Sequence, residues 1–358
     1  MAKYRRELRQ RNHGSSVMAK PPTMKDVAAA AGVSVMSVSR ALRDNTVVSE
    51  ARRRHIREVA DRLGYVFDST AANLRLQRTG FVAITIPSIN NANFADTVRG
   101  LSDGLAENGL QVLLGYTNYN PQREEKLIHQ LLQRRPEAMV VTGGRHTDRA
   151  RRFIGGAGIP VIETWDLPQD PIGNVVGFSN AETTRMTVEH LLQRGYRRIA
   201  FVGGDTAGDT RGADRRTGFI RTMRAHGVDA SRLISAGQKA PISMREGAAA
   251  MADLLSRYPD SEAVICVSDL SAFGAITECQ RRGIAVPGDI AVAGFGNYEI
   301  SDVSVPPITT VDPFPLDIGR RCAEMLGKLL GRPQESVPPH RVEITPEFLP
   351  RASTMKAG

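Results

Sequence analysis

The chain has 358 residues, of which 41% are hydrophobic and 24% are charged, proportions typical of a protein with a packed core. This length predicts two or three domains. No apolar run approaches the ~20 residues that a membrane span needs, and the basic N-terminus lacks the apolar stretch of a secretory signal. We therefore expect a cytoplasmic protein with no transmembrane segment and no membrane partner.

The positive charge is concentrated near the N-terminus. Residues 1–79 hold 16 Lys and Arg against 7 Asp and Glu, whereas residues 80–358 hold 31 of each, so the first segment carries the whole net charge of +9. A run such as Arg52-Arg53-Arg54 is in many proteins only a solvated helix face. A basic module joined to a neutral body is more typical of a protein that binds a polyanion at one end.

Local signals in the basic module predict three short helices. Thr23 and Asp26 have capping-box spacing and place a helix start just before Val27, and Gly32 ends that helix. Ser34 is a suitable N-cap for a second helix. Ser49 can cap a third helix that runs from about 50 to 63, and Gly64 ends it. The module therefore resembles a helix-turn-helix unit in its spacing.

Such units insert the start of their second helix into the major groove of DNA. At that position Val35 and Met36 can contact bases through apolar groups, Ser37 can bond to phosphate or base, and Arg40 can donate to guanine or phosphate. The alternative is a helical hairpin in which Met36 packs against a neighbour. The DNA-binding candidates are Thr23, Ser34, Val35, Met36, Ser37, Ser39 and Arg40.

From Gly80 onward, short apolar runs rich in β-branched residues alternate with helical stretches, which predicts doubly wound parallel sheets in two α/β lobes. The expected strands lie at 81–87, 111–117, 138–143 and 160–165, and then at 198–204, 263–269 and 290–296. The expected helices lie near 94–108, 121–135, 213–226, 244–257 and 270–282. Ligands of such sheets bind beyond the carboxyl ends of the strands, so we expect a cleft between the lobes that strand-end residues line.

Motifs that would indicate catalysis are missing from the sequence. "GGDTAG" does not fit the dinucleotide-binding spacing, and there is no phosphate-binding GxxxxGK[ST], no nucleophile elbow and no metal-spaced histidine pair. Cys266, Cys279 and Cys322 have neither paired nor metal-ligand spacing and are expected to be buried free thiols. We expect no cofactor, no metal and no enzymatic activity. The alternatives are an α/β sugar-metabolising enzyme with a basic nucleic-acid-binding arm, or a solute-binding transport component.

The segment "TMKDVAAAAGVSVMSVSRAL" resembles the DNA-binding signature of the lactose/galactose-repressor (LacI/GalR) family of bacterial transcription regulators. The resemblance implies that Val35, Met36 and Arg40 read bases. It also implies that "STAANLRLQRTG" is a hinge helix whose Leu74 wedges into the minor groove, a contact that kinks the duplex. The chain departs from the family at "YVFDS", where a proline and an asparagine are usual.

The resemblance covers nearly all of residues 22–353 and implies a two-lobed, periplasmic-binding-protein-like fold. It assigns the effector contacts to Asn91, Phe94, Asp166, Arg215, Asp269 and Asn297. Sugar-binding members commonly have an aspartate where this chain has Gly296, and the loss of that carboxylate reduces repulsion toward an anionic ligand. Arg215 remains as a bidentate partner for a carboxylate. Together with "PSINNANFADTVRG", "VVGFSN" and "ECQRRGIAVP", which look most like the gluconate-utilisation repressors, this favours a sugar acid such as gluconate.

The expected organisation is an all-α head with a hinge helix, followed by a two-lobed α/β body with parallel sheets. The predicted segments are a basic, disordered tail (1–21), a DNA-binding domain (22–68), a hinge (69–79) and an effector-binding and dimerisation domain (80–353). Within that domain we assign 80–178 and 313–335 to the first lobe, and 179–312 and 336–353 to the second.

The function expected from the sequence is a repressor of sugar-acid catabolism genes at the nucleoid. One helical module reads only a short half-site, so we expect a homodimer on a pseudo-palindromic, double-stranded operator. Further pairing into a tetramer is left open, as is a translation start at Met18 instead of Met1. A small effector that prefers one lobe arrangement would shift DNA affinity through linkage.

Overall fold

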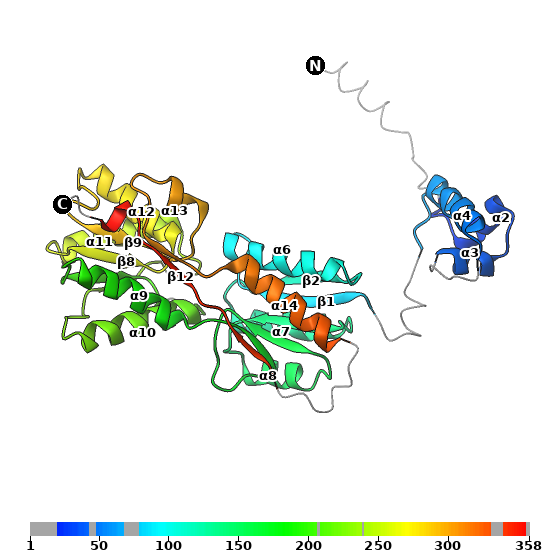
Figure 1. Ribbon diagram of the computed structural model, residues 1–358, viewed down its shortest axis with the longest axis horizontal. Coiled ribbons are helices and arrows are strands. Elements are labelled where there is room, and N and C mark those ends of the chain that lie inside the picture. The colour runs from blue at the N-terminus through cyan, green and yellow to red at the C-terminus, as the bar shows by residue number, and fades with distance from the viewer. Residues whose placement is uncertain are drawn as a thin grey trace, which may run out of the picture. The chain divides into compact units, whose positions relative to one another are not determined.

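The computed structural model describes residues 20–42, 48–67, 79–205, 208–237, 240–330 and 339–355. The chain divides into two compact units, Met1–Gln77 and Arg78–Gly358, each of which is described here by itself (Figure 1). Most of the predicted tail and of the predicted hinge, with Leu74, lies outside the described residues. Within the described ranges, no helix is both long enough and apolar enough to cross a membrane.

The first unit contains three helices, α2 (Met24–Ala31), α3 (Val35–Leu42) and α4 (Glu50–Leu63). Each helix turns one narrow apolar face inward, and all three pairs of helices are in contact. The fully buried core residues are Val27, Val38, Ala41, Ile56 and Val59. Because these side chains recur three or four residues apart, the apolar pattern alone determines which face of each helix is buried.

The helix ends follow the local signals in the sequence. The backbone N–H and the hydroxyl of Thr23 both donate to the Asp26 carboxylate at 2.7 Å, and these hydrogen bonds lower the pKa of Asp26. Helix α2 thus begins at Met24, a little before the predicted start. At the next helix the Ser37 N–H donates to Ser34 Oγ at 3.1 Å. Gly32 has a φ of 64°, a left-handed conformation that glycine adopts without strain.

The first lobe of the second unit is built on a six-stranded parallel sheet with the order β11-β5-β4-β3-β1-β2. Its strands are β1 (Phe81–Ile86), β2 (Gln111–Tyr116), β3 (Ala138–Thr142), β4 (Val161–Thr164), β5 (Asn174–Gly177) and β11 (Arg341–Glu343). Helices α6 (Ala92–Ala106) and α14 (Pro315–Leu329) cover one face, and α7 (Pro121–Leu132) and α8 (Asp148–Gly155) cover the other. The strands β1, β3 and β4 are buried almost completely, as expected for a parallel sheet with helices on both faces.

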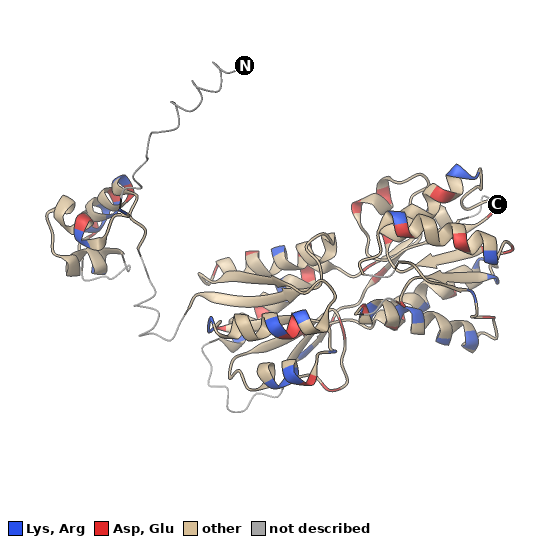
Figure 2. Ribbon diagram, turned by 180° about the vertical axis from the view of Figure 1, so that it is seen from behind, with Lys and Arg blue, Asp and Glu red and all other residues tan. Residues whose placement is uncertain are grey.

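The second lobe has a four-stranded parallel sheet with the order β7-β6-β8-β9. Its strands are β6 (Ile199–Val202), β7 (Leu233–Ile234), β8 (Ala263–Cys266) and β9 (Ala291–Ala293). Helices α9 (Asn180–Gln193) and α10 (Thr210–Ala225) lie on one face, and α11 (Met244–Arg257) and α12 (Asp269–Arg281) lie on the other; the short α13 (Glu299–Val303) follows β9. Acidic and basic side chains are intermixed over both lobes (Figure 2), in agreement with the neutral charge of this part of the sequence.

The chain crosses between the lobes after β5, after β10 (Thr310–Asp312) and after β11. Strand β10 pairs antiparallel with β12 (Glu347–Leu349), and a short 3-10 helix, η1 (Ala352–Thr354), follows. The assignment of residues 336–353 to the second lobe is wrong for β11, because Arg341–Glu343 pair in parallel with Val175–Gly177 of β5. Only one side chain of this three-residue strand is even partly buried, so its sequence carries no strand pattern.

Candidate functional site

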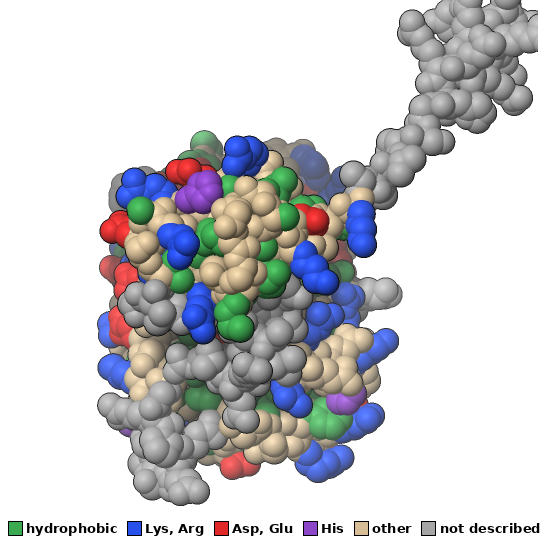
Figure 3. Space-filling view, turned by 90° about the vertical axis from the view of Figure 1, so that its right-hand side faces the viewer, with side chains coloured by type: hydrophobic (Ala, Val, Ile, Leu, Met, Phe, Trp, Pro, Cys, Tyr) green, Lys and Arg blue, Asp and Glu red, His purple; other side chains and the backbone are tan. Residues whose placement is uncertain are grey.

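The first residues of α3 form the exposed surface of the helical unit that the sequence predicts to read DNA. Val35 is 41% exposed and Met36 63% exposed, although both are apolar, while Val38 on the opposite side of the helix is fully buried. Arg40 is exposed one turn further along. Exposed apolar side chains beside a cation are the groups that contact base edges in a major groove. In Figure 3, exposed apolar side chains lie among Lys and Arg side chains, and Asp and Glu side chains appear at fewer places.

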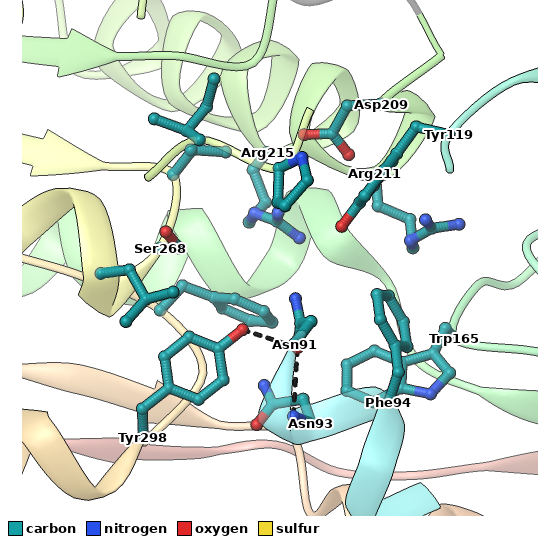
Figure 4. A pocket seen from close by; sticks show the side chains of 15 residues that line it. Asn91, Asn93, Phe94, Tyr119, Trp165, Asp209, Arg211, Arg215, Ser268 and Tyr298 are labelled. Carbon is teal, nitrogen blue, oxygen red and sulfur yellow. Dashed lines mark hydrogen bonds between the residues drawn. The ribbon is translucent and has the colours of Figure 1, made fainter. Parts of the chain in front are cut away.

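The second unit has a cavity between its two lobes (Figure 4). Residues from the ends of strands in both lobes line it. They are Asn91, Asn93, Phe94, Tyr119, Trp165, Asp209, Arg211, Arg215, Pro241, Ile242, Val267, Ser268, Leu270, Phe295 and Tyr298. The cavity therefore combines aromatic walls with polar groups, as is typical of a site for a small polar ligand. Asp209 is the one acidic residue in this described lining.

Helix α10 supplies two cationic groups of the cavity. Its N-cap, Asp209, accepts a hydrogen bond of 3.0 Å from the Gly212 N–H, and Arg211 and Arg215 follow one turn apart. The Arg215 Nη1 donates to Asn180 Oδ1 at 2.6 Å, and its guanidinium carbon lies 4.3 Å from the centroid of the Phe295 ring. Burial lowers the pKa of Arg215, although a guanidinium stays protonated at neutral pH.

Sequence reasoning missed Arg211. This residue is only 6% exposed, and its guanidinium carbon lies 5.5 Å from the centroid of the Phe94 ring. The signal that points to it is its spacing, since residues i and i+4 of a helix share a face and Arg211 is four residues before Arg215. The spacing alone does not show which face of α10 lines the cleft, so it points to Arg211 only when the orientation of the helix is known.

The opposite side of the cavity is polar and uncharged. Asn91 caps α6, where its Oδ1 accepts from the Asn93 N–H at 3.1 Å and from the Tyr298 hydroxyl at 2.8 Å. Asn91 belongs to the first lobe and Tyr298 to the second, so this hydrogen bond joins the lobes. Burial raises the pKa of Tyr119 to about 12, which keeps its hydroxyl available as a donor.

Aromatic side chains form one wall of the cavity. Phe94 and Trp165 pack edge to face with their ring centroids 5.1 Å apart, and the Trp165 indole N–H donates to Thr97 Oγ1 at 3.1 Å. Trp165 and Tyr119 both have left-handed backbone conformations, with φ values of 67° and 55°. Non-glycine residues rarely adopt this region, and such strain is commonly found around ligand sites.

Three of the six residues predicted to contact an effector line this cavity, namely Asn91, Phe94 and Arg215. Asp166 instead lines a separate cavity beside Arg145 and Asp214, where its Oδ1 accepts from the Leu167 N–H at 2.9 Å. The role of the three lining residues as effector contacts remains a prediction.

The assignment of Asp269 as a ligand contact is wrong. Its side chain is 0% exposed and is used inside the second lobe, where it accepts hydrogen bonds from the Tyr298 N–H at 2.9 Å and from Thr310 Oγ1 at 2.7 Å. Burial raises its pKa to about 7. Asp269 therefore holds Tyr298 in place, and the neighbouring Ser268 is the strand-end residue that faces the cavity.

Asn297 is also directed away from the cavity. Its Nδ2 donates to Asp312 Oδ2 at 2.9 Å, and its Oδ1 accepts from Arg351 Nη2 at 2.8 Å. Asp312 is the last residue of β10, and Arg351 follows β12. Asn297 thus stabilises the connection between the lobes and is not among the residues that line the cavity, and its contact with an effector stays a prediction.

The loop after β3 is partly buried. The His146 side chain is 0% exposed, with Nδ1 3.0 Å from Glu124 Oε2 and Nε2 3.8 Å from Glu163 Oε1. Burial by itself would lower the pKa of His146, but the hydrogen bond and charge of Glu124 outweigh it and raise that pKa. Next to it, Arg145 forms an ion pair with Asp214 of α10, which links the lobes at a second point.

No group of three or more His, Cys, Asp or Glu side chains in the described ranges is arranged to hold a metal ion. Cys266, Cys279 and Cys322 are buried free thiols.

Two family models match the chain. The model described as bacterial regulatory proteins, lacI family, matches residues 23–68, and the model described as periplasmic binding protein-like domain matches residues 188–354. These matches confirm the expected family and fold class. The first covers the three-helix unit with α3, and the second covers most of the second lobe together with the crossover strands.

Individual proteins match over nearly the whole length. The HTH-type transcriptional regulator GntR of Pseudomonas aeruginosa is 36% identical over 309 residues, which are 86% of this chain and 89% of that protein. GntR of Escherichia coli is 32% identical over 91% of this chain and 96% of its own length. The crystal structure of a LacI-family transcriptional regulator from Silicibacter pomeroyi superposes with a TM-score of 0.86 at 32% identity, over 94% of this chain and 100% of that one. With its helix-turn-helix unit and its two-lobed α/β unit, the chain belongs to the lacI family of bacterial regulatory proteins and is a DNA-binding transcriptional regulator.

Proposed function

We propose that the protein is a homodimeric repressor without catalytic activity, and that a sugar acid in the cavity between its lobes controls its binding to an operator. The observation that carries this proposal is the charge of the cavity, because Arg211 and Arg215 face it and Asp209 is the one acidic residue among the described residues that line it. Buried cations without a matching anion are unfavourable, so a cavity of this composition selects a ligand that supplies one.

The α3 surface supports the DNA-binding half of the proposal. Val35 and Met36 would contact base edges, including thymine methyl groups, and Arg40 would donate to guanine or phosphate. Thr23, Ser34, Ser37 and Ser39 would position the unit on the backbone, since hydroxyl groups commonly bond to phosphates. Leu74, outside the described residues, is proposed as the minor-groove wedge on the resemblance stated above.

The local structure at Gly296 supports an acid in preference to a neutral sugar. A Cβ at this position would lie 2.9 Å from Asn93 Nδ2, and the φ of 122° disfavours any side chain. A carboxylate side chain at 296, as in sugar-binding members of the family, would therefore be strained here and would require the Asn93 side chain to move. The ligand would then direct its hydroxyl groups to Asn91, Asn93 and Tyr298, and its carboxylate to α10.

Control of DNA binding would follow from linkage. A ligand that makes contacts with both lobes favours the closed arrangement, and it changes operator affinity only by its differential affinity for the two arrangements. We propose induction, because the substrate of a catabolic pathway should release the genes for its own use. A dimer places two α3 helices on the two halves of a pseudo-palindrome, and two half-sites give the specificity that one unit lacks.

A thermal-shift screen of the full-length protein tests the effector class. The panel contains aldonic acids, uronic acids and the neutral sugars of the same carbon skeletons. We expect stabilisation by an aldonic acid such as D-gluconate, with about 2.7 kcal/mol of added stability at a ligand concentration 100 times Kd. If neutral sugars stabilise the protein and no sugar acid does, the proposal is contradicted. Any stabilising compound is then added to an operator-binding assay, where we expect it to weaken the complex.

A further inference from the structure

The two arginines of α10 differ in the donors that they can offer to a ligand. In Arg215, Nη1 is taken by Asn180 Oδ1 at 2.6 Å, and Nε is buried without any hydrogen-bond partner. A ligand cannot reach a nitrogen that is closed off in this way. Arg215 therefore offers a ligand its Nη2 and only the remaining N–H of Nη1, which are fewer free donors than a guanidinium without an internal partner has.

Arg211 has its whole set of donors available. No hydrogen bond or ion pair engages its guanidinium in the part of the chain that the structure describes, and none of its nitrogens is closed off as Arg215 Nε is. The residue as a whole is nevertheless 6% exposed. A guanidinium has five N–H donors in a fixed planar arrangement. A buried group of this kind without an internal partner indicates that its anion comes from outside the chain.

The first lobe is shaped to receive Arg211 from the second. A Cβ on Gly143, at the end of β3, would lie 2.9 Å from Arg211 Nη1, and Gly143 has a φ of 98° that favours glycine. The guanidinium also lies over the ring of Phe94 in α6. Arg211 therefore reaches across the cleft, whereas Arg215 bonds to Asn180 within its own lobe. Figure 4 shows the Tyr119 hydroxyl between the two guanidinium groups.

We propose that Arg211 binds the carboxylate of the effector through two parallel N–H···O hydrogen bonds, and that Arg215 contributes one further N–H from Nη2. This inference rests on the proposed function and assigns its main specificity-determining residue. Among the described residues that line the cavity, Arg211 and Arg215 carry two positive charges and Asp209 one negative charge, which leaves a single charge to neutralise. The ligand class is therefore a sugar acid with one carboxylate, in preference to a dicarboxylate or a phosphate ester.

The position of Arg211 also links the carboxylate to lobe closure. The anion would be held at the point where α10 of the second lobe meets Phe94 and Gly143 of the first. The hydrogen bonds to the carboxylate come from α10 alone, but Phe94 and Gly143 lie against the Arg211 guanidinium only when the lobes are together, so a ligand that holds Arg211 in this position favours the closed arrangement. A neutral polyol would lose this contact but keep its hydrogen bonds to Asn91 and Tyr298.

The test is calorimetric titration of the full-length protein with D-gluconate, with its neutral counterpart D-glucitol and with the dicarboxylate D-glucarate. The variants are Arg211→Lys, Arg211→Gln and Arg215→Lys. Arg221→Lys is the matched control, since Arg221 lies on the same helix with its side chain 60% exposed and pairs with Glu182 at 2.8 Å. Lysine keeps the charge but cannot form the paired hydrogen bonds. Thermal unfolding and operator binding of each variant show that it is folded.

We expect Arg211→Lys to weaken D-gluconate binding about tenfold or more and Arg215→Lys about threefold or less, because only the first loses a paired contact. Arg221→Lys should leave the affinity unchanged, and Arg211→Gln should lose the preference for D-gluconate over D-glucitol. An equal or larger loss in Arg215→Lys, or a wild-type preference for D-glucarate, overturns this inference but leaves the proposed function standing. If the wild type binds no aldonic acid, the inference and the proposed function are both wrong. If Arg211→Gln does not fold, the comparison of Arg211→Lys with Arg215→Lys tests the inference.

Discussion

The hydroxyl of Tyr298 donates a 2.8 Å hydrogen bond to Oδ1 of Asn91, and so connects the second lobe to the N-terminus of helix α6 in the first. The same oxygen accepts from the Asn93 N–H, so it helps to cap the helix and to hold the lobes together. Both residues line the cavity between the lobes. The position of one lobe against the other is therefore part of the geometry of the ligand site.

The cross-lobe hydrogen bond should contribute to effector binding. Tyr298→Phe removes the donor and should weaken effector affinity by about 0.5–1.5 kcal/mol, the usual net value of one such bond. Measured with Asn91→Ala in a double-mutant cycle, the pair should show a coupling energy of about 1 kcal/mol in the effector Kd. Additive effects of the two substitutions would show that the bond does not stabilise the ligand-bound arrangement.

Base recognition by α3 should depend on Arg40. Arg40→Ala should reduce operator affinity or discrimination by about 1–3 kcal/mol, because it removes a charged donor from the groove-facing side of the helix. Fluorescence anisotropy with operator and random duplexes at fixed salt measures both quantities. Effector binding should be unchanged in this variant, and a loss of effector affinity would show that the protein is misfolded.

Arg215 should be required for the response to the effector. Arg215→Ala removes one cation from the cavity and leaves Asn180 Oδ1 without its donor, so the variant should bind operator normally but fail to release it when a sugar acid is added. The comparison is an operator-binding titration with and without effector. A normal response in Arg215→Ala would contradict the assignment of this cavity as the effector site.

Asp269 should make stability depend on pH. Its pKa is raised to about 7 in the folded protein, against about 3.9 in an unfolded chain. The folded state therefore retains a proton that the unfolded state loses, and the free energy of unfolding should fall as pH rises from about 4 to about 7 and then level off.

The isosteric variant Asp269→Asn removes this titration. Its stability relative to wild type should rise with pH over the same window, by on the order of 2–4 kcal/mol in urea unfolding. Asp302→Asn is the control, because that carboxylate is 76% exposed and bonds only weakly to Arg351 at 3.8 Å. A parallel pH dependence in wild type and Asp269→Asn would show that Asp269 is ionised throughout.

Much of the architecture could be predicted from the sequence, because the signals that define it are local. Thr23 and Asp26 are three residues apart, so their capping interaction forms within one turn of helix. The glycine at 32 ends α2 by its own backbone conformation. The alternation of apolar strands and helices likewise predicted two α/β lobes. Helices that cover both faces of a parallel sheet bury each strand on both sides, so its strands appear in the sequence as continuous apolar runs.

The chemical role of each strand-end residue depended on partners that are distant in the sequence. Asp269 bonds to Thr310, 41 residues away, and so it supports the site instead of facing the ligand. Arg211 lies on the cavity side of α10 only because Phe94 and Gly143 of the other lobe meet that helix. The sequence by itself thus determined the helical head and the two lobes, which arise from interactions between neighbouring residues and from the apolar pattern. Only the tertiary structure decided which polar side chains are paired inside the protein and which retain free hydrogen-bonding groups, because that depends on contacts between segments far apart in the chain.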